Sequence, residues 1–206
     1  MLRATLLLLV MLNPFATVLY LTNLMQERSR REFTDIYLRA ALFTFIILWG
    51  FALTGDFVLD KMFQVSLPAV RIFGGITIFM AAYTYLMQGP EGIKLFRGDV
   101  NTIAQHIALP FLVGPGAIWV SIQMGQDFGP VLSLGMILGA LAVSTAVTFL
   151  YAALVQESAG KVALTRIMSY FQMAMRLNAL LIGAVAVQMV LSGIQQFIAS
   201  SGGAAG

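Results

Sequence analysis

The chain has 206 residues, of which 59% are hydrophobic and 10% are charged, whereas a soluble domain averages about 25% charged residues. Its mean hydropathy of +0.88 excludes an ordinary soluble domain and predicts a single transmembrane domain over residues 1–206 in a lipid bilayer. The absence of cysteine excludes disulfides and cysteine-ligated metals. The net charge of +3 does not indicate nucleic acid as a partner, because membrane proteins carry basic residues in their cytoplasmic loops.

Six runs of the chain are long and apolar enough to cross a membrane, which takes about 20 helical residues. They are 4–25, 37–55, 68–87, 103–124, 130–155 and 174–198. The sequence therefore predicts an all-α membrane protein with six transmembrane helices. The apolar stretch within the long link 156–173 is expected to lie on the membrane surface or to pack under the bundle. Residues 199–206 are small and glycine-rich, which predicts a flexible tail.

Lysine and arginine are distributed unevenly between the two predicted sides of the membrane. The links after the first, third and fifth spans hold nine of them, namely Arg28, Arg30, Arg31, Arg39, Lys94, Arg97, Lys161, Arg166 and Arg176, and the opposite side holds only Arg3, Lys61 and Arg71. Because cytoplasmic loops are rich in these residues, the bias places both termini outside the cell. The expected location is the plasma or inner membrane of a prokaryote.

Two of the predicted spans contain a proline in the middle of the apolar run. Pro14 follows Asn13 in the first span, and Pro115 lies between Gly114 and Gly116 in the fourth. A proline inside a helix removes one backbone donor and clashes with an earlier carbonyl, and hydrocarbon offers no partner for the freed groups. Each break is expected roughly 15 Å into the membrane, near its midplane. A single proline would indicate an ordinary kink, but two matched breaks favour a solute-binding site.

The two breaks also indicate an internal repeat. Six spans divide into two groups of three, and related groups of three must be inverted across the membrane. Pro14 precedes Arg71, at the start of the third span, by 57 residues, and Pro115 precedes Arg176, at the start of the sixth, by 61. We therefore expect two inverted three-helix repeats, at about residues 1–90 and 100–198.

Polar and small side chains recur at helical spacing in several spans. Thr17 shares a face with Asn13, and Thr77 lies on a small and polar face of the third span. Such stripes line a small polar cavity or serve helix packing, since small residues let backbones approach closely. For Gly135 and Gly139 of the fifth span, close helix packing is the favoured interpretation.

Few residues of the chain suggest reaction chemistry. Arg71 and Arg176, at opposite membrane surfaces, either extend to the headgroups or bind a carboxylate and gate access, because the guanidinium fork matches a carboxylate. The lone His106 at the start of the fourth span is expected to pack at the interface. No paired carboxylates, nucleophile motif, phosphate loop or metal motif occurs, so neither an enzyme nor a cofactor is expected.

Three motifs in order resemble the MarC family of prokaryotic integral membrane proteins. They are Leu12-Asn13-Pro14-Phe15 in the first span, IALPFLVGPGAI at 107–118 and RLNALLIGAVAVQM at 176–189. Ala16 stands where the family usually has glycine, and Asn178 and Ala179 replace a Met-Gly pair. The resemblance covers most of the chain. It implies six spans and, from some relatives, transport of small neutral amino acids such as glycine or alanine.

Together these patterns predict a secondary transporter of a small neutral solute that works by alternating access. Asn13, Pro14, Thr17, Thr77 and the Gly114-Pro115-Gly116 segment would hold the solute. Coupling to protons or sodium and assembly as a homo-oligomer are both compatible with the sequence. The alternatives are a passive pore with a continuous polar lining, a membrane scaffold without transport, and an exporter of the lysine-exporter type, whose motif order differs.

Overall fold

The computed structural model describes residues 1–62, 64–88, 103–105, 107–157 and 161–202. Within these residues the chain is helical and forms no strand. The helices are α1 (Leu2–Leu12), α2 (Pro14–Glu27), α3 (Arg30–Asp56), α4 (Leu67–Gln88), α6 (Pro115–Glu157) and α7 (Lys161–Gly202), with short π-helical segments at Phe57–Met62 and Ile107–Leu112. The predicted all-α membrane fold is therefore confirmed.

Five segments of the described chain are long and apolar enough to cross a membrane, where the sequence predicts six. They are Leu2–Leu19, Arg30–Gly55, Leu67–Thr84, Pro115–Val155 and Ser169–Ala199. The fourth segment joins parts of the predicted fourth and fifth spans, because α6 continues through Gly129. At Gly129 the backbone has φ 76° and ψ 176°, which only glycine adopts without strain.

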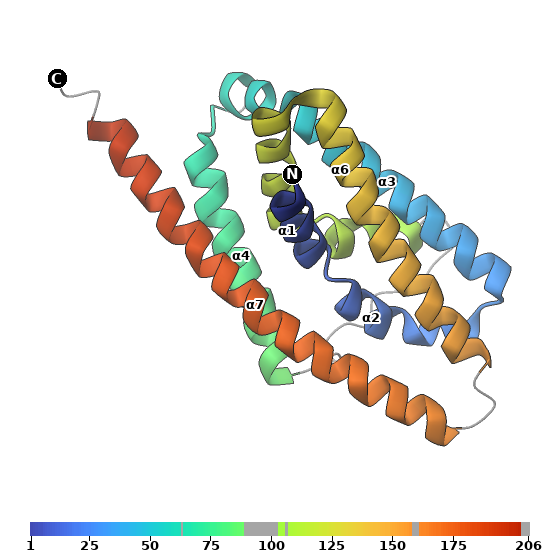
Figure 1. Cartoon of the computed structure of the whole chain (residues 1–206). Coiled ribbons are helices and arrows are strands. Elements are labelled where there is room, and N and C mark those ends of the chain that lie inside the picture. The colour runs from blue at the N-terminus through green and yellow to red at the C-terminus, as the bar shows by residue number, and fades with distance from the viewer. Residues whose placement is uncertain (63, 89–102, 106, 158–160, 203–206) are drawn as a thin grey trace.

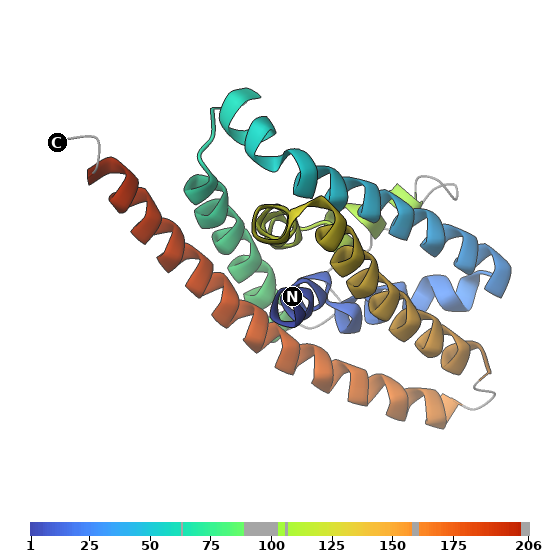
Figure 2. The same cartoon turned by 45° about the horizontal axis from the view of Figure 1, so that its top comes forward.

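Gly129 divides α6 into two arms that meet at a sharp bend (Figures 1 and 2). The first arm begins at Pro115 and the second begins at Pro130. Both starts follow the preference of proline for the first turn of a helix, where its missing N–H costs nothing. The first arm is shorter than the roughly 30 Å hydrocarbon thickness of a membrane.

The helices form a bundle in which α1 and the first arm of α6 lie inside (Figures 1 and 2). Helices α3 and α6 pack together on one side, and α4 and α7 pack together on the other. We call the end that holds the start of α1 and the bend of α6 the Gly129 end. The opposite end, at the junction of α2 and α3, is the Ser29 end (Figure 1).

Close helix contacts occur at glycines other than those expected. A Cβ on Gly75 of α4 would lie 2.8 Å from the carbonyl oxygen of Ala186 in α7, and a Cβ on Gly125 of α6 would collide with the carbonyl of Ala52 in α3. In contrast, no described residue lies within 4 Å of a Cβ built on Gly135 or Gly139. In the described part of the chain no other helix covers these two glycines, so the predicted close packing is not found there.

Helix α7 extends beyond the predicted sixth span at both ends. Helix α7 is continuous from Lys161 to Gly202, so residues 199–202 of the predicted flexible tail are helical, and 203–206 lie outside the described residues. The apolar stretch near the start of α7 packs under the bundle through Phe171, whose ring contacts Tyr151 and Phe15.

The α3–α6 contact predicts a difference between two glycine substitutions in α6. Gly125→Ala would push a methyl group into the Ala52 backbone, and overpacking costs about 1–3 kcal/mol. Gly135→Ala adds a methyl group in open space and improves helix propensity by about 0.5–1 kcal/mol. Thermal unfolding in detergent should show a lower Tm for Gly125→Ala and an equal or higher Tm for Gly135→Ala. Equal Tm values for the two variants would contradict the observed packing.

Candidate functional site

The first span breaks at Asn13, between α1 and α2. Asn13 has φ 47° and ψ 63°, a left-handed conformation that asparagine tolerates better than most residues. Its N–H donates to the carbonyls of Leu9 and Val10, which ends α1. Its side-chain Oδ1 accepts from the N–H of Ala16 at 3.2 Å, which begins α2. One residue thus caps both half-helices, and the predicted break in the first span is confirmed.

The side chain of Asn13 also reaches a distant helix. Its Oδ1 accepts a hydrogen bond from Nδ2 of Asn178 in α7, at 2.8 Å, and both residues are buried. Thr17 lies one turn further along α2 and donates to the carbonyl of Asn13 at 3.1 Å. Because buried polar groups must find partners inside the protein, this network stabilises the break.

The second break resembles the first in its chemistry. The π-helical segment Ile107–Leu112 ends before Gly114, and α6 begins at Pro115. Pro14 likewise occupies the first position of α2. In both places proline starts a helix rather than interrupting one, so the cost expected for a proline in a helix interior is largely avoided. The predicted break in the fourth span is also confirmed.

The structure brings the two breaks close together. A Cβ on Gly116 would lie 2.7 Å from Sδ of Met11, which is two residues before Asn13. A Cβ on Gly74 of α4 would lie 3.4 Å from Cβ of Pro115. A larger residue at position 116 would therefore displace the side chains of Met11 and Ile78. These contacts place the second break beside α4 and beside the end of α1.

On the Ser29 side of the breaks, three aromatic rings from three helices pack together. Phe171 of α7 lies between Tyr151 of α6, with 4.5 Å between ring centroids, and Phe15 of α2, at 6.2 Å. The hydroxyl of Tyr151 lies 3.3 Å from Oγ1 of Thr22 in α2. We call Phe15, Tyr151 and Phe171 the closing layer, because they join α2, α6 and α7 on the Ser29 side of the breaks.

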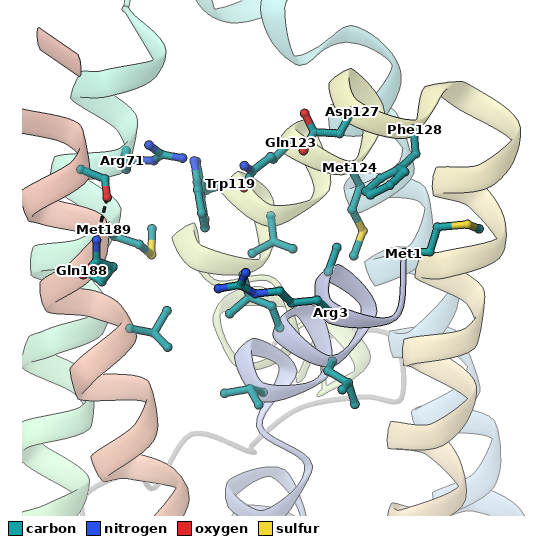
Figure 3. Close-up of a pocket in the computed structure, with 17 residues that line it drawn as sticks. Met1, Arg3, Arg71, Trp119, Gln123, Met124, Asp127, Phe128, Gln188 and Met189 are labelled. Carbon is teal, nitrogen blue, oxygen red and sulfur yellow. Dashed lines mark hydrogen bonds between the residues drawn. The ribbon is translucent and has the colours of Figure 1, made fainter. Parts of the chain in front are cut away.

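On the other side of the breaks, a cavity of about 700 Å³ lies at the Gly129 end (Figure 3). It is lined by α1 from its start to Val10, by Arg71 of α4, by the first arm of α6 and by α7 between Val185 and Ser192. Val10 lies three residues before Asn13, so the cavity ends close to the first break. Most of the lining is apolar, which is usual for sites that bind small molecules.

The most unusual polar group in this cavity is Arg71. Only 9% of its surface is exposed, and its guanidinium carbon lies 4.5 Å from the centre of the Trp119 ring. This cation–π contact contributes about 0.5–2 kcal/mol. Nε of Arg71 has no hydrogen-bond partner among the described residues. Arg71 therefore lies largely inside the protein, against Trp119.

The other predicted site residues are distributed over different surroundings. Thr77 donates to the carbonyl of Phe73 one turn earlier in α4 and does not line the cavity. Arg176 is exposed on α7, two residues before the buried Asn178. Their roles in binding and gating stay predictions, and His106 lies outside the described residues.

Two residues of the site were missed by sequence reasoning. Trp119 lies among many apolar residues, and only its contact with Arg71 distinguishes it. Asn178 carried a signal, because a buried amide in an apolar helix requires a partner. Its partner Asn13 lies 165 positions away in the chain, so the pairing could not be derived from spacing.

Comparisons with known proteins agree with this architecture. The family model described as "MarC family integral membrane protein" matches residues 1–198. A UPF0056 membrane protein of Pyrococcus horikoshii is 28% identical over 195 residues, which cover 93% of this chain and 92% of the relative. One of Archaeoglobus fulgidus is 31% identical and covers 84% and 83%, and one of Bacillus subtilis is 25% identical and covers 89% and 88%.

The names of these relatives state a membrane protein but no substrate. No solved structure matches the chain. The family model spans nearly all of the sequence, and the chain therefore belongs to the MarC family of integral membrane proteins.

Proposed function

We propose that this protein is a secondary transporter of a small neutral solute, of the class of glycine or alanine, and that it works by alternating access. One observation carries the proposal: a cavity at one end of the bundle extends to Val10, three residues before the first helix break, while the closing layer lies on the other side of the breaks. A transporter must at each moment close its site to one side of the membrane, and this arrangement suits that requirement.

The helix breaks suit a solute that carries both charges. Asn13 and Gly114 each precede a helix whose N-terminal end is electrically positive, and each follows a helical segment whose C-terminal end is negative. A zwitterion can meet both kinds of ends at one level of the membrane. The polar groups of Asn13 and Thr17 form hydrogen bonds within the protein. A bound solute would therefore replace some of these bonds with bonds of its own.

An inverted repeat is part of the proposal. The first half would contain the broken span α1–α2 followed by α3 and α4. The second half would contain the span broken before Pro115, followed by the second arm of α6 and by α7. In this correspondence α3 matches the second arm of α6, and α4 matches α7. The packing of α3 against α6 and of α4 against α7 supports it, because each helix then lies beside its counterpart. Such repeats give transporters two similar conformations that face opposite sides.

The proposed orientation follows from charge. Arg28, Arg30 and Arg31 lie at the Ser29 end and are exposed, which favours that end in the cytoplasm. The cavity would then open to the outside of a prokaryotic plasma membrane, and both termini would be outside. Coupling to a proton or sodium gradient and assembly as a homo-oligomer belong to the proposal as well.

Transport can be tested with purified protein in lipid vesicles. Radiolabelled glycine or alanine should accumulate in vesicles preloaded with the same unlabelled amino acid, because an alternating carrier exchanges solute across the membrane. Uptake should saturate, and it should be measured with and without pH and sodium gradients. Flux that rises linearly with concentration and shows no counterflow would indicate a passive pore, and no uptake above empty vesicles would contradict the proposal.

We expect Asn178→Ala to make the closing layer more accessible to reagents from the Ser29 end. This change removes the bond to Asn13, while Asn13 keeps its bond from Ala16. A buried side-chain bond contributes about 0.5–1.5 kcal/mol, or about a 2- to 10-fold change in an equilibrium. Because the chain has no cysteine, Thr22→Cys supplies a single thiol beside the layer. Its labelling by a membrane-impermeant reagent should be about 2- to 10-fold faster with Asn178→Ala.

The control for this measurement is Gln172→Ala, because Gln172 is exposed on the same helix. It should leave the labelling rate of the Thr22→Cys thiol unchanged. An equal rate in the Asn178→Ala and Gln172→Ala backgrounds would show that the Asn13–Asn178 bond does not hold this side closed.

A further inference from the structure

Two buried donors meet in the wall of the cavity without partners. Nε of Arg71 in α4 and Nε1 of Trp119 in α6 are both buried and have no hydrogen-bond partner among the described residues. Trp119 is 6% exposed and Arg71 is 9% exposed. Figure 3 shows the two side chains side by side, with the nitrogen-bearing edge of Trp119 near the guanidinium. Buried polar groups in native proteins nearly always have a partner, so this pair requires an explanation.

The chemistry of the pair restricts what could bind it. Arginine and the tryptophan indole donate hydrogen bonds and accept none, so their common ligand must be an acceptor. The positive charge of Arg71 favours an anion, and a carboxylate presents two oxygens that match donors from two directions. An ammonium group or a metal cation would be repelled.

The surroundings do not supply such an anion. The described lining residues of the cavity include two cations, Arg3 and Arg71, and one carboxylate, Asp127. Asp127 is exposed at the mouth of the cavity, and the described residues show no ion pair between it and Arg71. On α7, Gln188 donates to Oγ of Ser192 at 3.1 Å, and both line the same wall (Figure 3). The wall therefore combines excess positive charge with neutral polar groups.

The location of the pair is fixed by packing. Next to Arg71, Ile72 packs against Gly193 of α7, where a Cβ would lie 2.6 Å from the Ile72 side chain. The indole ring is held on the first arm of α6 and supports the guanidinium from one face. A guanidinium restrained in this way loses little conformational freedom when a ligand binds.

We propose that Arg71 and Trp119 form a carboxylate-binding subsite that receives the carboxylate of the transported solute before it reaches the helix breaks. The inference rests on the proposed function for its role in transport, but its binding chemistry stands on the cavity alone. The subsite selects the carboxylate, while the open part of the cavity leaves the rest of the solute unrestricted. A solute without a carboxylate would not be retained.

Fluorescence of Trp119 tests the subsite directly. The chain has two tryptophans, so Trp49→Phe leaves Trp119 as the single reporter in the full-length protein in detergent. Alanine and propionate, which share a carboxylate, should change the emission saturably, whereas alaninamide, which keeps the amine and lacks the carboxylate, should not. Equal responses to alanine and alaninamide, or no response to any of the three, would overturn the proposal.

Two arginine substitutions separate a local contact from general charge. In the single-tryptophan protein, Arg71→Gln should weaken alanine binding by about 10- to 100-fold. Arg3→Gln removes the same charge from an exposed lining residue and should weaken it by less than about threefold. Equal losses in the two variants would overturn the subsite. Arg71→Lys, which keeps the charge but not the fork, should also bind more weakly and serves if Arg71→Gln does not fold.

Binding and flux distinguish this inference from the proposed function. Carboxylate-selective binding that depends on Arg71, without any flux in vesicles, would support the subsite and refute transport. Saturable alanine flux that persists unchanged in Arg71→Gln would support transport and refute the subsite.

Discussion

The structure depends on how a transmembrane helix can be interrupted without leaving backbone groups unpaired in hydrocarbon. The interruption at Asn13 succeeds because one side chain and one left-handed residue serve both half-helices. The bond from Asn178 then fixes the interruption to α7. Without these bonds, each free N–H or C=O in the membrane would cost several kcal/mol. The cavity and the closing layer lie on opposite sides of this interruption, so its position determines theirs.

Much of the fold follows from elementary patterns in the sequence. Apolar runs indicate the helices, and proline indicates both breaks. The sequence does not separate a proline inside a helix from a proline that starts one, and Pro14 and Pro115 both start helices. It also does not show that α6 continues across Gly129 as two arms, because turn signals in Gly-Pro pairs are local and the direction of each arm depends on packing.

The candidate site was less accessible to sequence reasoning than the fold. Asn13 and Arg71 were expected at the site because polar residues in apolar spans require a reason. Their partners Asn178 and Trp119 come from other helices, and only three-dimensional packing brings them together. The small residues show the same limit: the spacing of Gly135 and Gly139 predicts a close helix contact, but helix backbones approach most closely at Gly125 and Gly75. Spacing identifies a face of a helix and not the neighbour that covers it.

The central claim is that the closing layer must separate for solute to cross. Because the chain has no native cysteine, Phe15→Cys and Phe171→Cys can be combined so that a bifunctional methanethiosulfonate reagent joins α2 to α7 across the layer through reducible bonds. Exchange of labelled alanine in vesicles, measured before and after crosslinking, tests the claim most directly. The account predicts that exchange stops when the crosslink forms and returns on reduction. Undiminished exchange in a preparation that mass spectrometry shows to be fully crosslinked would contradict it.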